Sequence, residues 1–215
     1  MQANGRFIVL EGLDGSGTTT QTNLLAQWFS GEGARYGKCV ASFEPTPGPA
    51  GSVTRLALNH RLTLDSRTMA LLFAADRTDH LFKEGSSQQE PGIFHLLQQG
   101  MHVICDRFLL SSLAYQSLTL PMEWILQINA QAIVPDVTIF IDIDPAISMR
   151  RLLDNRSHRD LYEAEETQSQ VRAQYEKAIL LLESEGQRIV RIDGSRSQEE
   201  VHHAILVEAQ KVLPA

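Results

Sequence analysis

The sequence predicts an α/β fold in which a five-stranded parallel sheet lies between two layers of helices. Short apolar segments alternate with amphipathic helical segments along the chain, and the apolar segments are hydrophobic on both faces, as buried parallel strands are. A glycine-rich turn between the first strand and the first helix supports the same fold class. No internal repeat and no linker rich in proline or serine divides the 215 residues. One domain over residues 1–215 is therefore expected.

Five segments are predicted to be strands. Each is short and mainly apolar, and the fourth is the clearest because β-branched residues occupy both of its faces. The predicted strands are residues 7–11, 38–43, 102–106, 137–143 and 188–193.

Helices are predicted between the strands from apolar periodicity and from their terminal signals. Asp65 or Ser66 should cap the third helix, Pro91 should be the first residue of the fourth, and Ser197 with Glu200 has capping-box spacing. A polar, arginine-bearing segment at 154–163 precedes the longest helix. The predicted helices cover about residues 18–30, 52–59, 66–83, 91–100, 111–117, 121–132, 145–153 and 165–185, with the last opening at Ser197.

The composition is that of an ordinary globular protein, with 43% hydrophobic and 21% charged residues. A formal net charge of −7 is unfavourable for general binding to a nucleic-acid polymer. No apolar run approaches the ~20 residues that a membrane helix needs, and the N-terminal residues do not resemble a signal peptide. We therefore expect a cytoplasmic protein with no membrane and no nucleic-acid polymer as partner.

The main chemical signal is a glycine-rich segment between the first predicted strand and helix. Its spacing matches a phosphate-binding loop, in which backbone N–H groups converge on phosphate oxygens and the following helix N-terminus adds partial positive charge. A glycine-rich turn without a ligand is the alternative interpretation. The residues expected to hold phosphates are Gly12, Gly15, Ser16, Gly17, Thr18, Thr19 and Thr20.

Thr18 stands where such loops carry a lysine. Lysine brings a positive charge to the β- and γ-phosphates, whereas threonine brings only a hydroxyl. Losing one good transition-state donor costs about 3–4 kcal/mol, so we expect phosphate binding by backbone amides to survive better than the reaction rate.

Two oxygen-bearing residues form a candidate magnesium site. Thr19 falls where the hydroxyl ligand of Mg²⁺ belongs in these loops, and Asp106 ends an apolar strand beside the loop. A helix cap or turn is the alternative role for Asp106. Arg107 follows directly and should point into the same crevice at the carboxyl ends of the strands.

Five blocks, in order along the chain, resemble the thymidylate kinase family. The resemblance implies a P-loop nucleoside-monophosphate kinase fold with a lid at about 154–163. It also implies transfer of the γ-phosphate of ATP to dTMP with Mg²⁺, and a homodimer. The blocks are Phe7–Gly17, Glu44-Pro45 with Arg55, Leu71–Arg77, Asp106–Gln116, and Pro135-Asp136 with Arg150-Arg151.

The resemblance also assigns roles on the acceptor side. Phe73 would stack on thymine, and Arg77 and Gln116, with Ser112 nearby, would hydrogen-bond the edge of the base. Arg107 would hold the acceptor phosphate, and Arg55 would approach the acceptor. Asp14 would meet the sugar hydroxyl, and Tyr115 would crowd the place of a ribose 2′-OH.

On the donor side, the resemblance places arginines of the lid at the phosphates of ATP. Arg151 stands at the entry to this segment, and Arg156 and Arg159 lie within it. Solvated loop arginines are the alternative. Arg107, Arg156, Arg159 and Asp14 are the residues expected to take part in catalysis, which needs alignment and charge neutralisation because the acceptor phosphate is already anionic.

The chain departs from the family pattern at several of these positions. Thr18 replaces the loop lysine, Phe43 stands where an arginine begins the second block, Phe108 replaces a tyrosine, and Leu110 stands where many members have aspartate. Two other functions therefore stay open: a nucleotide-binding or regulatory protein that kept the fold, and a kinase for another nucleotide acceptor.

Overall fold

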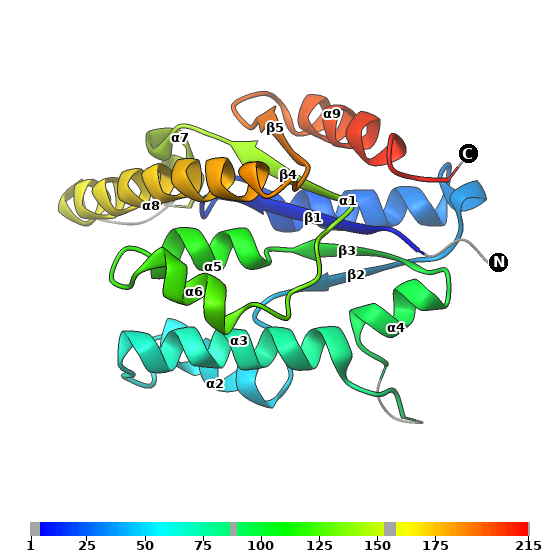
Figure 1. The fold of residues 1–215 in the computed structure, drawn as a ribbon. Coiled ribbons are helices and arrows are strands. Elements are labelled where there is room, and N and C mark those ends of the chain that lie inside the picture. Colours follow the sequence, from blue (N-terminus) through cyan, green and yellow to red (C-terminus); the bar gives the residue numbers. More distant parts are fainter. Residues whose placement is uncertain (1–4, 87–89, 153–157, 215) are drawn as a thin grey trace.

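The computed structural model describes residues 5–86, 90–152 and 158–214, and the side chains of these residues except those of 158–164 (Figure 1). A five-stranded sheet with the order β2-β3-β1-β4-β5 forms its centre, and all four strand pairs are parallel. The predicted sheet is confirmed, with strand ends within one residue of those expected. The strands are β1 (Phe7–Gly12), β2 (Cys39–Phe43), β3 (His102–Asp106), β4 (Val137–Asp142) and β5 (Ile189–Asp193).

Helices cover both faces of the sheet (Figure 1). Alternate residues of β1 explain this, because Ile8 and Leu10 pack against one helical layer whereas Phe7 and Val9 pack against the other. The first layer holds α1 (Thr18–Ser30) and α9 (Gln198–Gln210). The second holds α3 (Ser66–Phe82), α4 (Ile93–Gln98), α5 (Leu109–Gln116), α6 (Met122–Ile128) and α8 (His158–Ser184). The remaining helical segments are η1 (Ala34–Tyr36), α2 (Pro49–Leu58) and α7 (Pro145–Leu152).

Two predicted helix starts are confirmed by their hydrogen bonds. Asp65 precedes α3, and its carboxylate accepts from the backbone N–H of Arg67 at 2.9 Å. Ser197 and Glu200 form the capping box of α9 with reciprocal bonds of 3.2 and 3.0 Å. Local sequence therefore fixes these two ends.

Five predicted helix ends are wrong by two to four residues, among them the end of α4, at Gln98 instead of residue 100. α2 begins at Pro49 instead of residue 52, since proline suits the first helical position. α4 begins at Ile93, not Pro91, because Gly92 is extended and packed so tightly that a Cβ there would lie 2.5 Å from the carbonyl oxygen of Leu81. α5 begins at Leu109 instead of residue 111, and α6 ends at Ile128 instead of residue 132.

α8 also begins earlier than expected, at His158 rather than about residue 165. The segment from Leu161 to Glu166 consists largely of strong helix formers, which favour this extension. The part of the predicted lid at 158–163 is thus helical, and the part at 154–157 lies outside the described residues.

α8 has 27 residues but, like the other described helices, it is not long and apolar enough to cross a membrane.

Candidate functional site

Two adjoining cavities open where the carboxyl ends of β1, β2 and β3 meet, as expected for a parallel sheet. The first, of about 660 Å³, lies among β2, α3 and α5 and is called here the aromatic cavity. The second, of about 1390 Å³, lies along the glycine-rich loop and is called the loop cavity. The side chains that line both are Asp14, Thr19, Leu58, Arg107 and Tyr115.

The glycine-rich loop takes a path that two of its glycines make possible. Gly15 and Gly17 have φ values of 79° and 97°, in the region that other residues rarely adopt. A Cβ on Gly15 would also lie 2.5 Å from the carbonyl oxygen of Ser148 in α7. The loop leads directly into α1, and its residues Gly15, Gly17, Thr18, Thr19 and Thr20 line the loop cavity. This placement fits a phosphate-binding loop.

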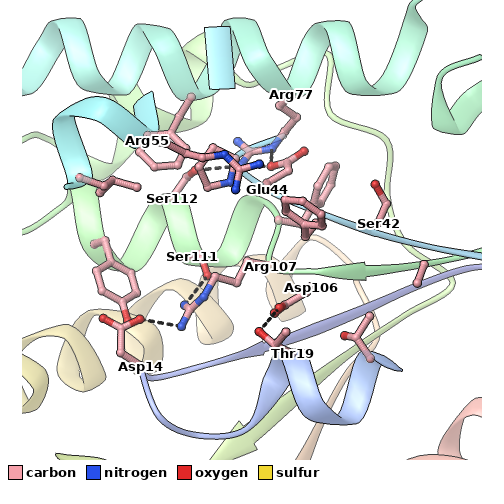
Figure 2. A pocket seen from close by; sticks show the side chains of 18 of the residues that line it. Asp14, Thr19, Ser42, Glu44, Arg55, Arg77, Asp106, Arg107, Ser111 and Ser112 are labelled. Carbon is pink, nitrogen blue, oxygen red and sulfur yellow. Dashed lines mark hydrogen bonds and ion pairs between the residues drawn. The ribbon is translucent and has the colours of Figure 1, made fainter. Parts of the chain in front are cut away.

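The predicted magnesium ligands lie side by side. The hydroxyl of Thr19 donates a hydrogen bond to Oδ2 of Asp106 (Figure 2). Oδ1 of Asp106 is buried and has no hydrogen-bond partner among the described residues. A hydroxyl oxygen and an unpartnered carboxylate oxygen are ligands that suit Mg²⁺, so this pair fits the ion.

Arg77 is the centre of a buried ion pair in the aromatic cavity. Its Nε and Nη2 lie 2.9 and 2.7 Å from Oε2 of Glu44. Nη2 also donates to Ser112 at 2.9 Å, and Nη1 donates to Asn129. A guanidinium has five N–H donors, and after these three hydrogen bonds and the ion-pair contact of Nη2 one N–H of Nη1 has no partner among the described residues.

The carboxylate of Glu44 is fixed from its other side as well. Nδ1 of His80 lies 3.1 Å from Oε1 of Glu44, and Nε2 of the same ring lies 2.6 Å from the hydroxyl of Ser42. Since α3 carries both Arg77 and His80, these contacts hold the end of β2 against α3. The position of Arg77 is therefore set by contacts made before any ligand binds.

Several polar atoms in the aromatic cavity lack a partner in the protein. Both side-chain amide atoms of Gln116 are buried without a hydrogen-bond partner among the described residues, and so is the hydroxyl of Tyr115. Burial raises the pKa of the Tyr115 hydroxyl, so it stays a neutral donor. Phe73 lines the same cavity. Buried polar atoms are normally paired, which indicates that a polar ligand completes this site.

Arg107 lies between the two cavities in an unusual backbone conformation, with a φ of 67°. Its Nη2 donates to Asp14 at 2.7 Å (Figure 2), and its Nη1 donates to the carbonyl oxygen of Gly12 at 2.8 Å. No described residue lies at hydrogen-bonding distance and angle from its Nε. The prediction that Arg107 points into the crevice is confirmed.

Two further residues at the site carry no signal in the local sequence. Glu11 is fully buried and accepts hydrogen bonds from the N-terminus of α5. Gln168 of α8 is buried, donates to Asp14 at 3.3 Å, and leaves its own Oε1 unpartnered among the described residues. Both contacts join segments far apart in sequence, so spacing along the chain could not have indicated either residue.

The structure brings all eight predicted acceptor-side residues to one cavity. The aromatic cavity is lined by Asp14, Arg55, Phe73, Arg77, Arg107, Ser112, Tyr115 and Gln116.

The predicted donor-side residues are only partly assembled. Gly12 and Ser16 belong to the loop but line neither cavity, and Arg151 donates instead to the carbonyl oxygen of Gly194 at 3.0 Å. Arg156 and the side chain of Arg159 lie outside the described part of the chain.

Comparisons with known proteins agree with this geometry. Residues 10–205 match the family model described as thymidylate kinase. A probable thymidylate kinase of Pyrococcus abyssi is 39% identical over 208 residues, which cover 94% of each chain. A putative thymidylate kinase of Aeropyrum pernix is 34% identical, and the match covers 89% of this chain and 86% of that protein. A putative thymidylate kinase of Treponema pallidum is 33% identical, and the match covers 93% of this chain and 92% of that protein. The fold, the phosphate loop and these matches together show that the chain belongs to the thymidylate kinase family, whose members are ATP-dependent nucleoside-monophosphate kinases.

Proposed function

We propose that this protein transfers the γ-phosphoryl group of ATP to the phosphate of dTMP and forms ADP and dTDP. One observation carries the proposal. The aromatic cavity holds Phe73, one unused N–H of Arg77 and the unpartnered amide of Gln116, and it adjoins the loop cavity at Arg107. A base with a polar edge fits the first cavity, and phosphates fit the second.

The polar groups of the aromatic cavity suit thymine. The remaining N–H of Arg77 can donate to a base carbonyl, and Gln116 can both donate and accept, which matches the C4 carbonyl and N3–H of a 2,4-dioxopyrimidine. The 4-amino group of cytosine would instead set a donor against the donor of Arg77. Leaving these buried groups unpaired is costly, so we expect cytosine nucleotides to be poor acceptors.

The sugar and the acceptor phosphate have candidate partners at the border between the cavities. We assign Asp14 to the sugar hydroxyl, and Tyr115 to the exclusion of a ribose 2′-OH. Arg107 has its Nε free of described partners, and Arg55 lines the aromatic cavity, so these two guanidinium groups can hold the acceptor phosphate.

The transfer step needs charge neutralisation more than proton transfer, because the acceptor phosphate is anionic at neutral pH. Backbone N–H groups of the glycine loop bind the donor phosphates, and Thr19 with Asp106 would hold Mg²⁺. When bound, Mg²⁺ neutralises charge on the phosphate oxygens.

Thr18 leaves the donor side short of positive charge. Among the described residues that line the loop cavity, Arg107 and His60 are the ones with cationic or protonatable nitrogen side chains, and Arg107 already pairs with Asp14. Arg156 and Arg159 are the candidate sources of the missing charge. If they do not supply it, turnover should be lower than that of an otherwise equal site with a loop lysine.

A coupled assay with ATP and Mg²⁺ against a panel of nucleoside monophosphates tests the proposal. We expect dTMP to be the best acceptor, with dCMP and the purine nucleotides far behind. Calorimetry on the same samples measures ATP and dTMP binding separately from turnover. Binding of both nucleotides without turnover would replace the kinase with a regulatory nucleotide-binding protein, and a different preferred acceptor would replace dTMP.

We also propose that the protein is a cytoplasmic homodimer, by likeness to the family. Sedimentation equilibrium at micromolar concentration would measure the mass of the particle. A monomer under these conditions would contradict the dimer.

A further inference from the structure

We propose that Glu11 is a positioning residue that sets Arg107 for the phosphate of the acceptor. The proposal rests on the function proposed above, in which Arg107 binds that phosphate. It starts from a buried carboxylate: Glu11 is fully buried near the end of β1, directly before the glycine loop, and lines neither cavity.

The carboxylate of Glu11 binds the chain immediately after Arg107. Its Oε1 accepts from the backbone N–H of Phe108 at 2.8 Å and from that of Ser111 at 3.1 Å. The backbone N–H of Arg107 donates to the carbonyl oxygen of Leu10 at 2.9 Å. β1 thus holds the chain on both sides of the Arg107 Cα, at the residue whose φ of 67° is unfavourable for an arginine.

The other oxygen of Glu11 acts on the guanidinium through the hydroxyl of Ser111. Oε2 accepts from that hydroxyl, whose oxygen lies 3.2 Å from Nη1 of Arg107. The Tyr175 oxygen lies 3.4 Å from Oε2 and 3.3 Å from Nη1, but its single proton has a shorter bond, of 3.0 Å, to the carbonyl oxygen of Gly12. Glu11 therefore orients the Ser111 hydroxyl, which helps to fix one end of the guanidinium.

On the opposite edge of the Arg107 guanidinium, Nε has no hydrogen-bond partner among the described residues. The hydrogen bonds turn Nη1 toward Gly12, and Asp14 occupies one N–H of Nη2. Nε and the second N–H of Nη2 are then the donors available to a phosphate monoester, which guanidinium groups bind with two parallel bonds. Burial raises the pKa of Glu11, while Ser111, Arg107 and Phe108 act in the opposite direction by stabilising its charged form.

The test compares dTMP with thymidine, which has the same base and sugar but no phosphate. Calorimetry gives the ratio of the dTMP affinity to the thymidine affinity. It is measured for the wild type, Glu11→Gln, Arg107→Ala and the double variant. We expect Glu11→Gln to lower the ratio roughly tenfold, as for a misplaced binding group, and to leave the thymidine affinity nearly unchanged. The double variant should show no lower ratio than Arg107→Ala alone, because Glu11 acts through Arg107.

A matched control is Asp136→Asn. Asp136 also accepts a backbone N–H bond, from Phe7 at 2.8 Å, but at the other end of β1. This variant should leave the ratio unchanged. If Glu11→Gln does not fold, as shown by near-UV circular dichroism, Ser111→Ala takes its place, since it removes one hydroxyl that joins Glu11 to Arg107.

The outcomes separate the two proposals. A wild type that binds dTMP no more tightly than thymidine, or binds neither, overturns the proposed function. Suppose that the ratio falls in Arg107→Ala but stays at the wild-type value in Glu11→Gln, or in Ser111→Ala where that variant replaces it. That result overturns the role of Glu11. Equal losses of dTMP and thymidine affinity in Glu11→Gln would show a general structural role instead and also overturn it.

Discussion

The guanidinium carbon of Arg55 lies 4.9 Å from the centre of the Phe43 ring, and both residues line the aromatic cavity. By the resemblance described above, Phe43 stands where an arginine is expected. Its aromatic face holds the positive charge of Arg55 in place. The stacking therefore positions one of the two guanidinium groups assigned to the acceptor phosphate.

Replacing Phe43 with alanine should weaken dTMP binding by roughly two- to fivefold, because an exposed cation–π contact contributes about 0.5–1 kcal/mol. Thymidine binding should change little, since Arg55 is assigned to the phosphate. Titration calorimetry with both ligands measures the difference. Leu62→Ala is a suitable control because Leu62 is also an exposed apolar residue but lines neither cavity. A larger loss for thymidine than for dTMP would contradict this role.

Restoring the loop lysine should raise turnover more than ATP affinity. In Thr18→Lys an ammonium group can reach the donor phosphates, and one such transition-state donor is worth roughly a hundred- to a thousandfold in rate. The coupled ATP/Mg²⁺ assay gives turnover, and calorimetry gives affinity. Thr20→Lys is the control, because it adds the same charge to the loop cavity at a neighbouring position.

If Arg156 or Arg159 already supplies that charge, Thr18→Lys should do little and alanine at one of these arginines should abolish turnover. The lysine and alanine variants therefore separate the two sources of charge. Turnover at background in the wild type and in all these variants, with nucleotides still bound, would rule out catalysis.

Phe73→Ala should weaken dTMP binding by about 1–3 kcal/mol, the range for stacking of a base on an aromatic ring. ATP binding should stay the same, because Phe73 lines the aromatic cavity and not the loop cavity. Phe94→Ala is the matched control, since Phe94 is 39% exposed and lines neither cavity. Unchanged dTMP affinity in Phe73→Ala would place the base elsewhere.

The Tyr115 ring should disfavour ribonucleotides. A 2′-hydroxyl pressed against a buried ring costs about 1–3 kcal/mol, so dUMP should bind roughly tenfold or more tightly than UMP. Tyr115→Ala should reduce this preference, whereas Tyr115→Phe should keep it, because the effect comes from the ring. Competition against dTMP in the kinase assay measures both ratios, and equal affinities for UMP and dUMP in the wild type would refute the assignment.

Glu11 should make stability depend on pH in a defined direction. Burial raises its pKa above 4.5 in the folded protein, so the folded state binds this proton more readily than the unfolded chain does. The free energy of unfolding of the wild type, relative to Glu11→Gln, should therefore fall as the pH rises from about 4.5 through the folded-state pKa. Urea unfolding of both proteins across this interval gives the difference, and a difference that rises with pH would contradict the raised pKa.

The sheet and the phosphate loop could be predicted because their signals are local. A strand such as β4 is an apolar run, and the glycine spacing from Gly12 to Gly17 is contained in six consecutive residues. The start of α5 could not be predicted, because the backbone N–H of Phe108 is capped by Glu11, 97 positions away. Likewise α6 ends at Ile128, directly before Asn129, whose side chain accepts from Arg77, 52 positions away.

The candidate site shows the same division. Family blocks indicated Arg77 and Gln116, but the partners that leave one donor of Arg77 free are visible only in three dimensions. Gln168 comes from α8, 154 positions after the aspartate that it contacts. Side chains that support the expected residues are therefore the part that sequence spacing does not reveal.

Tyr175 closes the cluster around Glu11 from a position 164 residues further along the chain. During synthesis on the ribosome, Glu11, Arg107 and Phe108 all emerge before α8 does. The Tyr175 hydroxyl contacts Nη1 of Arg107 at 3.3 Å and donates to the carbonyl oxygen of Gly12 at 3.0 Å, so both the arginine and the first glycine of the loop gain this support only when α8 docks.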